Sequence, residues 1–213
     1  MKTFLLSITL CFTLLGFSQN DPKAKALLDQ VSIKVKSYDN ISLDFRYVLH
    51  NSAENINQET RGDVVMEGDK YVLNILGITR IYDGKTMYSI NPEDEEVTIS
   101  TENPEDEGSI TPSKMLSFYT EGYTYKMGAK ENIKGRVIQF VKLTPIDSNS
   151  EIDHVLLGID PQTKHIYNLI EAGNNGTKTT LTVTSFETNQ TLSKALFSFN
   201  KDKYKNFYIN KLN

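Results

Sequence analysis

The sequence contains one cysteine and no tryptophan, and after its first twenty residues it has no long apolar run. The only cysteine, Cys11, lies in the leading apolar stretch. If that stretch is removed, the mature chain has no thiol, which excludes disulfides, zinc-thiolate sites and thiol catalysis. We therefore expect the stability of the mature protein to come from an ordinary apolar core.

The leading stretch, "MKTFLLSITLCFTLLGFSQN", is typical of a secretory signal peptide. It has a lysine at position 2, an apolar run from Phe4 to Leu15 and a small-residue ending at Gly16 and Ser18. The run is shorter than the roughly 20 apolar residues that a spanning helix needs. We therefore predict cleavage after Ser18, a signal peptide over residues 1–18 and an exported protein. No cysteine stands at the cleavage point, so the protein is not itself expected to carry a lipid.

Length and charge limit the possible partners. Removing 18 of the 213 residues leaves 195, and no stretch rich in Gly, Ser or Pro divides them. We expect one domain over residues 19–213. Loss of Lys2 moves the formal net charge from -4 to -5. This negative charge argues against nucleic acid, or an anionic membrane surface, as the main partner.

The apolar residues change period near position 40. Between positions 21 and 38 they recur every three or four residues, which predicts an amphipathic helix with Asp21 as N-cap and Pro22 in the first turn. From Ile41 they alternate with polar residues, which predicts a strand with one buried face. The predicted strands cover residues 41–50, 62–67, 71–76, 79–82, 86–90, 96–100, 123–127, 137–144, 154–159, 166–172 and 179–186.

Turn signals separate these strands, and Asp83-Gly84 and Asn175-Gly176 are the strongest of them. Asp-Gly and Asn-Gly between alternating segments mark hairpins, so the chain is predicted to be a long antiparallel meander. So many strands in one sheet tend to curl into a barrel or a trough. Residues 111–119 have a cap, a first-turn proline and an apolar stripe, which predict a short helix that covers part of the sheet.

Local catalytic and metal-binding signatures are missing. The three histidines have no metal-ligand spacing, and the chain has no nucleophile elbow, phosphate-binding loop or dinucleotide fingerprint. We therefore expect no metal, no cofactor and no enzymatic activity. A hydrolase assembled around Asp153, His154 and Asp160 is kept as a rival interpretation.

Apolar side chains are abundant, while only one long and one short helix are predicted to cover a large sheet. Either the sheet folds onto itself, or an apolar concavity is left for a lipophilic ligand. We expect the following residues to line that concavity, the last three of them on the helical lid: Phe45, Tyr47, Val64, Met66, Tyr71, Leu73, Ile75, Met115, Leu116 and Tyr119.

Five segments, taken in order, resemble one known family. They are "KALLDQVSIKVKSYDNISLDFRY", Gly62-Asp63, "IYDGKTMYSINPEDEEVTIS", "PSKMLSFY" and "ALFSFN". Their order and spacing are similar to those of the LolA family of periplasmic outer-membrane lipoprotein carriers, in the form found in Bacteroidetes-type bacteria. The arginine-proline pair that ties the lid to the barrel in the well-known branch is replaced here by "MEGDKYV".

The resemblance implies an unclosed β-barrel of about eleven antiparallel strands with helices as a lid. It further implies a monomeric periplasmic chaperone that binds the acyl chains of lipoproteins. Such a carrier would take its cargo from an inner-membrane lipoprotein-releasing ABC transporter and pass it to an outer-membrane acceptor. A periplasmic binder or sensor of another lipophilic ligand, such as a glycolipid or a pigment, stays open as an alternative.

Overall fold

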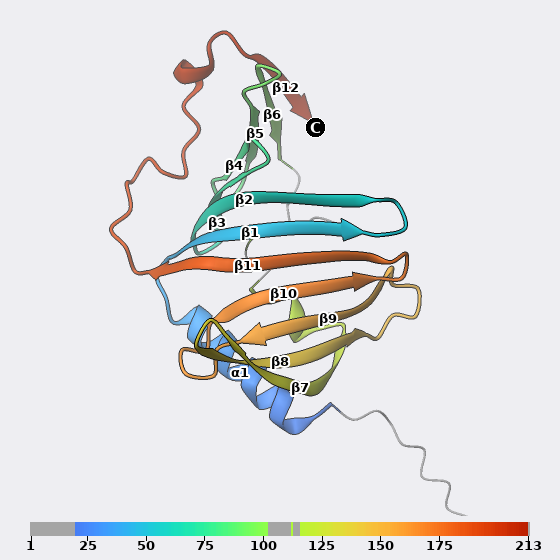
Figure 1. The fold of residues 1–213 in the computed structure, drawn as a ribbon. Helices are drawn as coiled ribbons and strands as arrows, with labels where there is room; N and C mark the ends of the chain where they lie inside the picture. Colours follow the sequence, from blue (N-terminus) through green and yellow to red (C-terminus); the bar gives the residue numbers. More distant parts are fainter. Residues whose placement is uncertain (1–19, 102–111, 113–115, 213) are drawn as a thin grey trace, which may run out of the picture.

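The computed structural model describes residues 20–101, 112 and 116–212. The predicted signal peptide, Met115 and much of the predicted mid-chain helix lie outside these residues. Within them, one α-helix packs against a single open, curved sheet (Figure 1). No helix of the described segments is long and apolar enough to cross a membrane.

The helix α1 (Pro22–Lys36) begins where the sequence predicts. The Asp21 side chain accepts a hydrogen bond of 2.8 Å from the backbone N–H of Lys23, and Pro22 occupies the first turn, where a missing N–H costs nothing. The apolar positions recur on one side of the helix, and four of them are buried against the sheet. These four residues are Ala24, Leu27, Leu28 and Val31.

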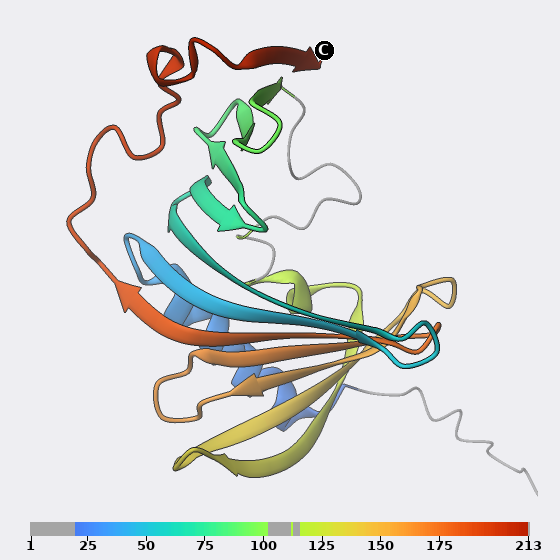
Figure 2. The same cartoon turned by 45° about the horizontal axis from the view of Figure 1, so that its top comes forward.

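The sheet has twelve strands in the order β12-β6-β5-β4-β3-β2-β1-β11-β10-β9-β8-β7. It stays open between its edge strands β12 and β7 and is not closed into a barrel, in agreement with the predicted mainly β, curved and unclosed architecture (Figures 1 and 2). The strands are β1 (Ile41–Asn51), β2 (Ile56–Glu67), β3 (Lys70–Ile75), β4 (Ile78–Tyr82), β5 (Met87–Asn91), β6 (Glu96–Ser100), β7 (Tyr123–Ile133), β8 (Arg136–Pro145), β9 (Ile152–Ile159), β10 (Ile166–Gly173), β11 (Thr177–Thr188) and β12 (Tyr208–Leu212).

Two features of the sheet differ from the prediction. The sequence predicts eleven strands and misses β12, which pairs in parallel with β6 at the edge, whereas the other strand pairs are antiparallel. The strand β2 begins at Ile56, six residues before the predicted start. Residues 57–59 are polar and exposed, because the β1–β2 hairpin extends beyond the covered part of the sheet, so they show no apolar alternation.

Two apolar clusters occupy opposite faces of the sheet. Neighbouring residues on a strand point to opposite faces, so Tyr71 joins the cluster beneath α1 while Val72 joins a second cluster. Buried Ile81, Ile90 and Val97 form the centre of that second cluster. The C-terminal segment runs to the end of the sheet formed by β4–β6 (Figure 2), and its aromatic residues Phe199, Tyr204 and Phe207 pack against this cluster.

A short 3₁₀ helix, η1 (Phe118–Thr120), overlaps the last two residues of the predicted mid-chain helix. The predicted helix over residues 111–119 is therefore described only at Pro112 and from Leu116 onward. Leu116 and Tyr119 are both buried, and both belong to the cluster beneath α1. The mid-chain segment thus contributes to covering the concave face, as expected.

Candidate functional site

The concave face of the sheet, together with α1 and residues 116–120, forms an apolar interior that we call the trough. Of the ten predicted lining residues, nine are described, and all nine belong to or pack against one cluster. Six are buried (Phe45, Val64, Met66, Tyr71, Leu116, Tyr119) and three are half-buried (Tyr47, Leu73, Ile75). Met115 lies outside the described residues. The structure thus brings these side chains together, and their contact with a lipid stays a prediction.

A small cavity lies inside the trough, and we call it the inner cavity. Its volume is about 40 Å³, which is close to the volume of one water and far below the roughly 300–1,000 Å³ of a ligand pocket. The described conformation is therefore closed, and a ligand must displace part of the cover. The lining side chains are all apolar: Leu43, Phe45, Val64, Leu73, Pro112, Leu116, Ile166, Leu169, Leu181 and Val183.

A larger pocket of about 350 Å³ lies at the C-terminal end of α1, and we call it the entrance pocket. Ile41 and Met66 line it, each two residues from a residue of the inner cavity on the same strand face. Leu116 lines both spaces and so separates them. The remaining apolar wall of the pocket is Val35 and Tyr38, and its polar rim includes Lys36, Asp39 and Asp69.

Polar contacts hold the N-terminal end of α1 against the edge strand β7. The backbone N–H of Asp21 donates to the carbonyl of Tyr125 (3.0 Å), and the N–H of Tyr125 donates to Oδ1 of Asn20 (2.8 Å). The N–H of Met127 also donates to the Asp21 carboxylate. The backbone N–H groups of Lys23, Met127 and Ala24, which donate to this carboxylate, lower the pKa of Asp21, Lys23 most strongly.

The other end of α1 is held by an aromatic group. The Tyr38 hydroxyl lies 2.7 Å from Nε2 of His165, and the His165 ring stacks on Phe186 at a centroid distance of 3.9 Å. Burial lowers the pKa of His165, and the nearby Lys34 ammonium adds to this effect. At Nε2 a neutral imidazole accepts a hydrogen bond from the Tyr38 hydroxyl in one tautomer and donates one to it in the other. This group provides a tie for α1 in a chain that lacks the arginine-proline pair.

Two tyrosines place hydroxyl groups inside the trough. The Tyr71 hydroxyl contacts the Met87 sulfur at 3.6 Å, and burial raises its pKa to about 12. Tyr119 is fully buried, and its hydroxyl has no hydrogen-bond partner among the described residues. Burial also raises the pKa of Tyr119. A buried hydroxyl without a partner destabilises the closed state.

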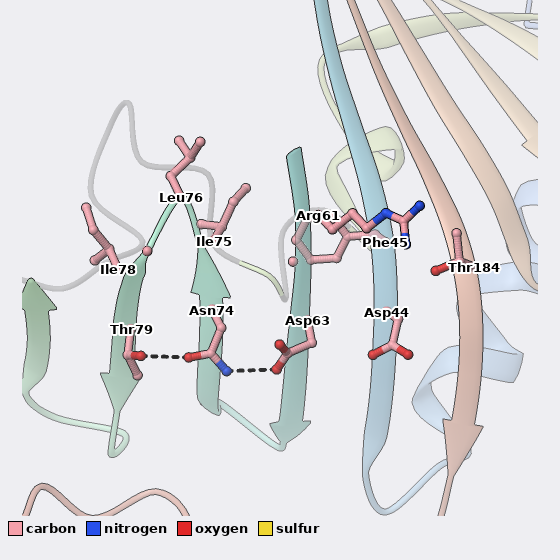
Figure 3. A pocket seen from close by; sticks show the side chains of 12 residues that line it. Asp44, Phe45, Arg61, Asp63, Asn74, Ile75, Leu76, Ile78, Thr79 and Thr184 are labelled. Carbon is pink, nitrogen blue, oxygen red and sulfur yellow. Dashed lines mark hydrogen bonds between the residues drawn. The ribbon is translucent and has the colours of Figure 1, made fainter. Parts of the chain in front are cut away.

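A more open and polar hollow of about 490 Å³ lies across β1–β4 and β11 (Figure 3). There Asn74 donates to the Asp63 carboxylate (2.8 Å) and accepts from the Thr79 hydroxyl (2.7 Å), so one chain of hydrogen bonds crosses three strands. These residues alternate with those of the trough and therefore face away from α1. Phe45 and Ile75, two of the predicted lining residues, also line this hollow, so it shares part of its wall with the predicted apolar site.

The residues of the rival hydrolase do not meet. Asp153 bonds to its neighbour His154 at the start of β9, which lowers the pKa of Asp153. Asp160 follows the end of β9, roughly 20 Å away at the rise of a strand, and its carboxylate accepts from the backbone of Gln162. Within the described segments no group of three potential metal ligands occurs.

Several trough residues were not predicted. The four buried residues of α1 and the inward residues of β9–β11, such as Leu169, Leu181 and Val183, lie in or against the same cluster. The apolar periodicity of these segments predicts the strands and the helix themselves. Which of their side chains share the trough, however, depends on the pairing of β1 with β11. That pairing joins residues that are 126 to 147 positions apart in the sequence, so it leaves no local signal.

A family model described as "Outer membrane lipoprotein carrier protein LolA" matches residues 77–200, which is more than half of the chain. The chain is a member of the LolA family. No curated protein matches this LolA-family chain.

Solved structures are similar to this chain at low sequence identity. An uncharacterized conserved protein from Thermus thermophilus has a TM-score of 0.55 and 11% identity, with 89% of this chain and 99% of that one covered. The lipoprotein LppX of Mycobacterium tuberculosis has a TM-score of 0.49 and 14% identity, covering 82% and 99%. A putative outer membrane lipoprotein-sorting protein domain from Vibrio parahaemolyticus has a TM-score of 0.46 and 12% identity, covering 86% and 98%.

Proposed function

We propose that this LolA-family chain is a periplasmic carrier that shelters the acyl chains of lipoproteins in its trough. The observation that carries the proposal is the inner cavity, whose lining is entirely apolar and which Leu116 separates from the larger entrance pocket. Membership of a family named for outer-membrane lipoprotein carriers supports it. The mature form begins after Ser18, forms one domain and receives cargo from an inner-membrane ABC transporter for delivery to an outer-membrane acceptor.

Burial of the acyl chains supplies the free energy of binding. Each methylene removed from water contributes about 0.8 kcal/mol, so a chain of about a dozen methylenes gains roughly 10 kcal/mol. Crossing an aqueous compartment without such a shelter is correspondingly unfavourable. Sheltering requires only an apolar surface, so the proposed function needs no catalytic group and no cofactor.

Release of the bound acyl chain follows from competition between that chain and α1 for the same apolar sheet face. In the closed state the apolar face of α1 and Leu116 occupy the concave face that a ligand would occupy. A bound acyl chain must displace them, and the lost contacts lower its net affinity. When an acceptor takes the chain, α1 can return, so the apolar sheet face is covered again.

Two substitutions on adjacent residues test the proposal. Leu73→Asn places an amide in the inner cavity, whereas Val72→Asn places it on the opposite face of the same strand, and both residues are half-buried. Burial of an amide without a partner costs roughly 1–3 kcal/mol, so we expect Leu73→Asn to weaken binding of a diacylated lipopeptide about tenfold or more. Val72→Asn should bind it like the unchanged protein.

The measurement is a titration of fluorescent diacylated lipopeptide, with circular dichroism to verify that both variants are folded. Equal binding by the two folded variants would show that Leu73 does not line the site. Native mass spectrometry of the protein isolated from its own periplasm identifies the cargo. A bound glycolipid or pigment would keep the trough as a lipid site but replace lipoprotein as its ligand.

A further inference from the structure

A single carboxylate, Glu171, lies on the concave face of the sheet beside the apolar cluster. It follows Leu169 by two residues on β10, with no register shift between them, so both side chains share one face. Leu169 lines the inner cavity. Across the neighbouring strands Glu171 stands opposite Val155, which is 1% exposed, and Thr179. Glu171 is therefore part of the trough.

The register places Glu171 at one end of the trough. Along β1 the concave positions run from Ile41 in the entrance pocket through the inner cavity to Leu49, which pairs with Thr179 next to Glu171. The carboxylate thus lies about 7 Å beyond Leu169, on the side away from the entrance pocket. Leu49, Leu169 and Thr179 are only half-buried, so this end of the trough is open to solvent.

Glu171 has no partner among the described residues. It makes no hydrogen bond or ion pair there, and burial alone raises its pKa. The nearby Tyr123 offers no compensation, because its own pKa is raised by burial and then by the Glu171 charge. A half-buried carboxylate in an apolar surface destabilises the fold when it is unpaired. Within the described part of the chain, this position therefore serves neither packing nor an ion pair.

We propose that Glu171 binds a primary ammonium group of the lipid ligand while its acyl chains fill the trough beneath α1. An ammonium supplies both the opposite charge and three hydrogen-bond donors, and such pairs strengthen where water is partly excluded. The spacing of about 7 Å from Leu169 suits an amine attached close to the first methylenes of a chain. The proposal rests on the lipid-carrier function proposed above and specifies the head group of its ligand.

Two sources supply this chemistry: the free amino terminus of an acylated lipoprotein and the head group of an aminophospholipid. The experiment uses matched pairs of probes that differ in the ammonium. One pair is a diacylated lipopeptide with a free amino terminus and its N-acetylated form. The other pair is phosphatidylethanolamine and phosphatidylglycerol with the same chains. Affinities are measured by titration for the unchanged protein, Glu171→Gln and the control Glu187→Gln, whose residue is exposed on β11.

We expect the unchanged protein and Glu187→Gln to prefer the ammonium-bearing member of at least one pair about tenfold, and Glu171→Gln to lose this preference. The pair that shows the preference identifies the source of the amine. A preference that persists in Glu171→Gln, or no preference in the unchanged protein, would overturn the role of Glu171 and leave the carrier function standing. Failure of the unchanged protein to bind any of the four probes would overturn both proposals.

Discussion

Replacing Leu28 by alanine should destabilise the protein and, at the same time, tighten lipid binding. Leu28 is 3% exposed and lies on the face of α1 that covers the trough. Buried Leu→Ala substitutions usually cost about 2–5 kcal/mol, from lost transfer free energy and from the cavity left behind. If a ligand displaces α1, the contacts of Leu28 are lost on binding in the unchanged protein but are already missing in the variant.

The expected size of the effect follows from this difference. A loss of about 2 kcal/mol from the closed state, with no change in the open liganded state, tightens the apparent affinity roughly 30-fold. The control is Ile90→Ala, in a residue that is 1% exposed on the opposite face of the sheet, within the second cluster. It should lower the free energy of unfolding by a similar amount without changing lipid affinity.

The assay combines urea unfolding in the absence of lipid with titration of a fluorescent diacylated lipopeptide. Tighter binding by Leu28→Ala than by Ile90→Ala is the expected result. Weaker binding by Leu28→Ala would refute the reasoning, because it would mean that Leu28 contacts the ligand. Equal affinities in both variants and the unchanged protein would show that α1 stays in place when a lipid binds.

Two further predictions concern stability. Tyr119→Phe removes a buried hydroxyl that has no hydrogen-bond partner among the described residues. We therefore expect the free energy of unfolding to rise by about 1 kcal/mol and the Tm measured by calorimetry to rise by about 2–4 °C. A lower Tm would show that the hydroxyl makes a hydrogen bond. Burial lowers the pKa of His165 in the folded state, so the unfolded state binds the proton more readily, and the free energy of unfolding should fall as the pH drops below about 6.5. His165→Asn should lose this dependence of stability on pH, whereas His50→Asn, at an exposed position, should keep it. The same pH dependence in both variants would contradict the assignment to His165.

Much of the fold follows from local patterns in the sequence. The helix α1 combines an N-cap, a first-turn proline and a helical period, and the Lys134-Gly135 turn joins β7 and β8 with both residues at positive φ, as a type I′ hairpin turn requires. Where one face of a strand is buried, the alternation of apolar and polar residues predicts the position of that strand. These signals agree because each element is specified by residues next to one another.

The missed features depend on contacts between distant segments. The strand β12 has five residues, and only Ile209 packs into the second cluster, so its parallel pairing with β6 leaves almost no pattern. The sequence places Glu171 only within a predicted strand, because its position in the trough follows from the register of β9, β10 and β11. A carboxylate that breaks the apolar pattern of a buried face becomes visible only when the register is known.

The attachment of α1 explains how a stable fold can open its trough. Both ends of the helix are held by polar or aromatic contacts, Asp21 with β7 and Tyr38 with His165, while its middle is held by apolar contacts with the sheet. An acyl chain can replace apolar contacts at little cost, but it cannot replace the hydrogen bonds at the two ends. Opening is therefore expected to begin where Leu116 separates the entrance pocket from the inner cavity, with the ties at the helix ends preserved. A fold built this way can expose the trough without unfolding the sheet.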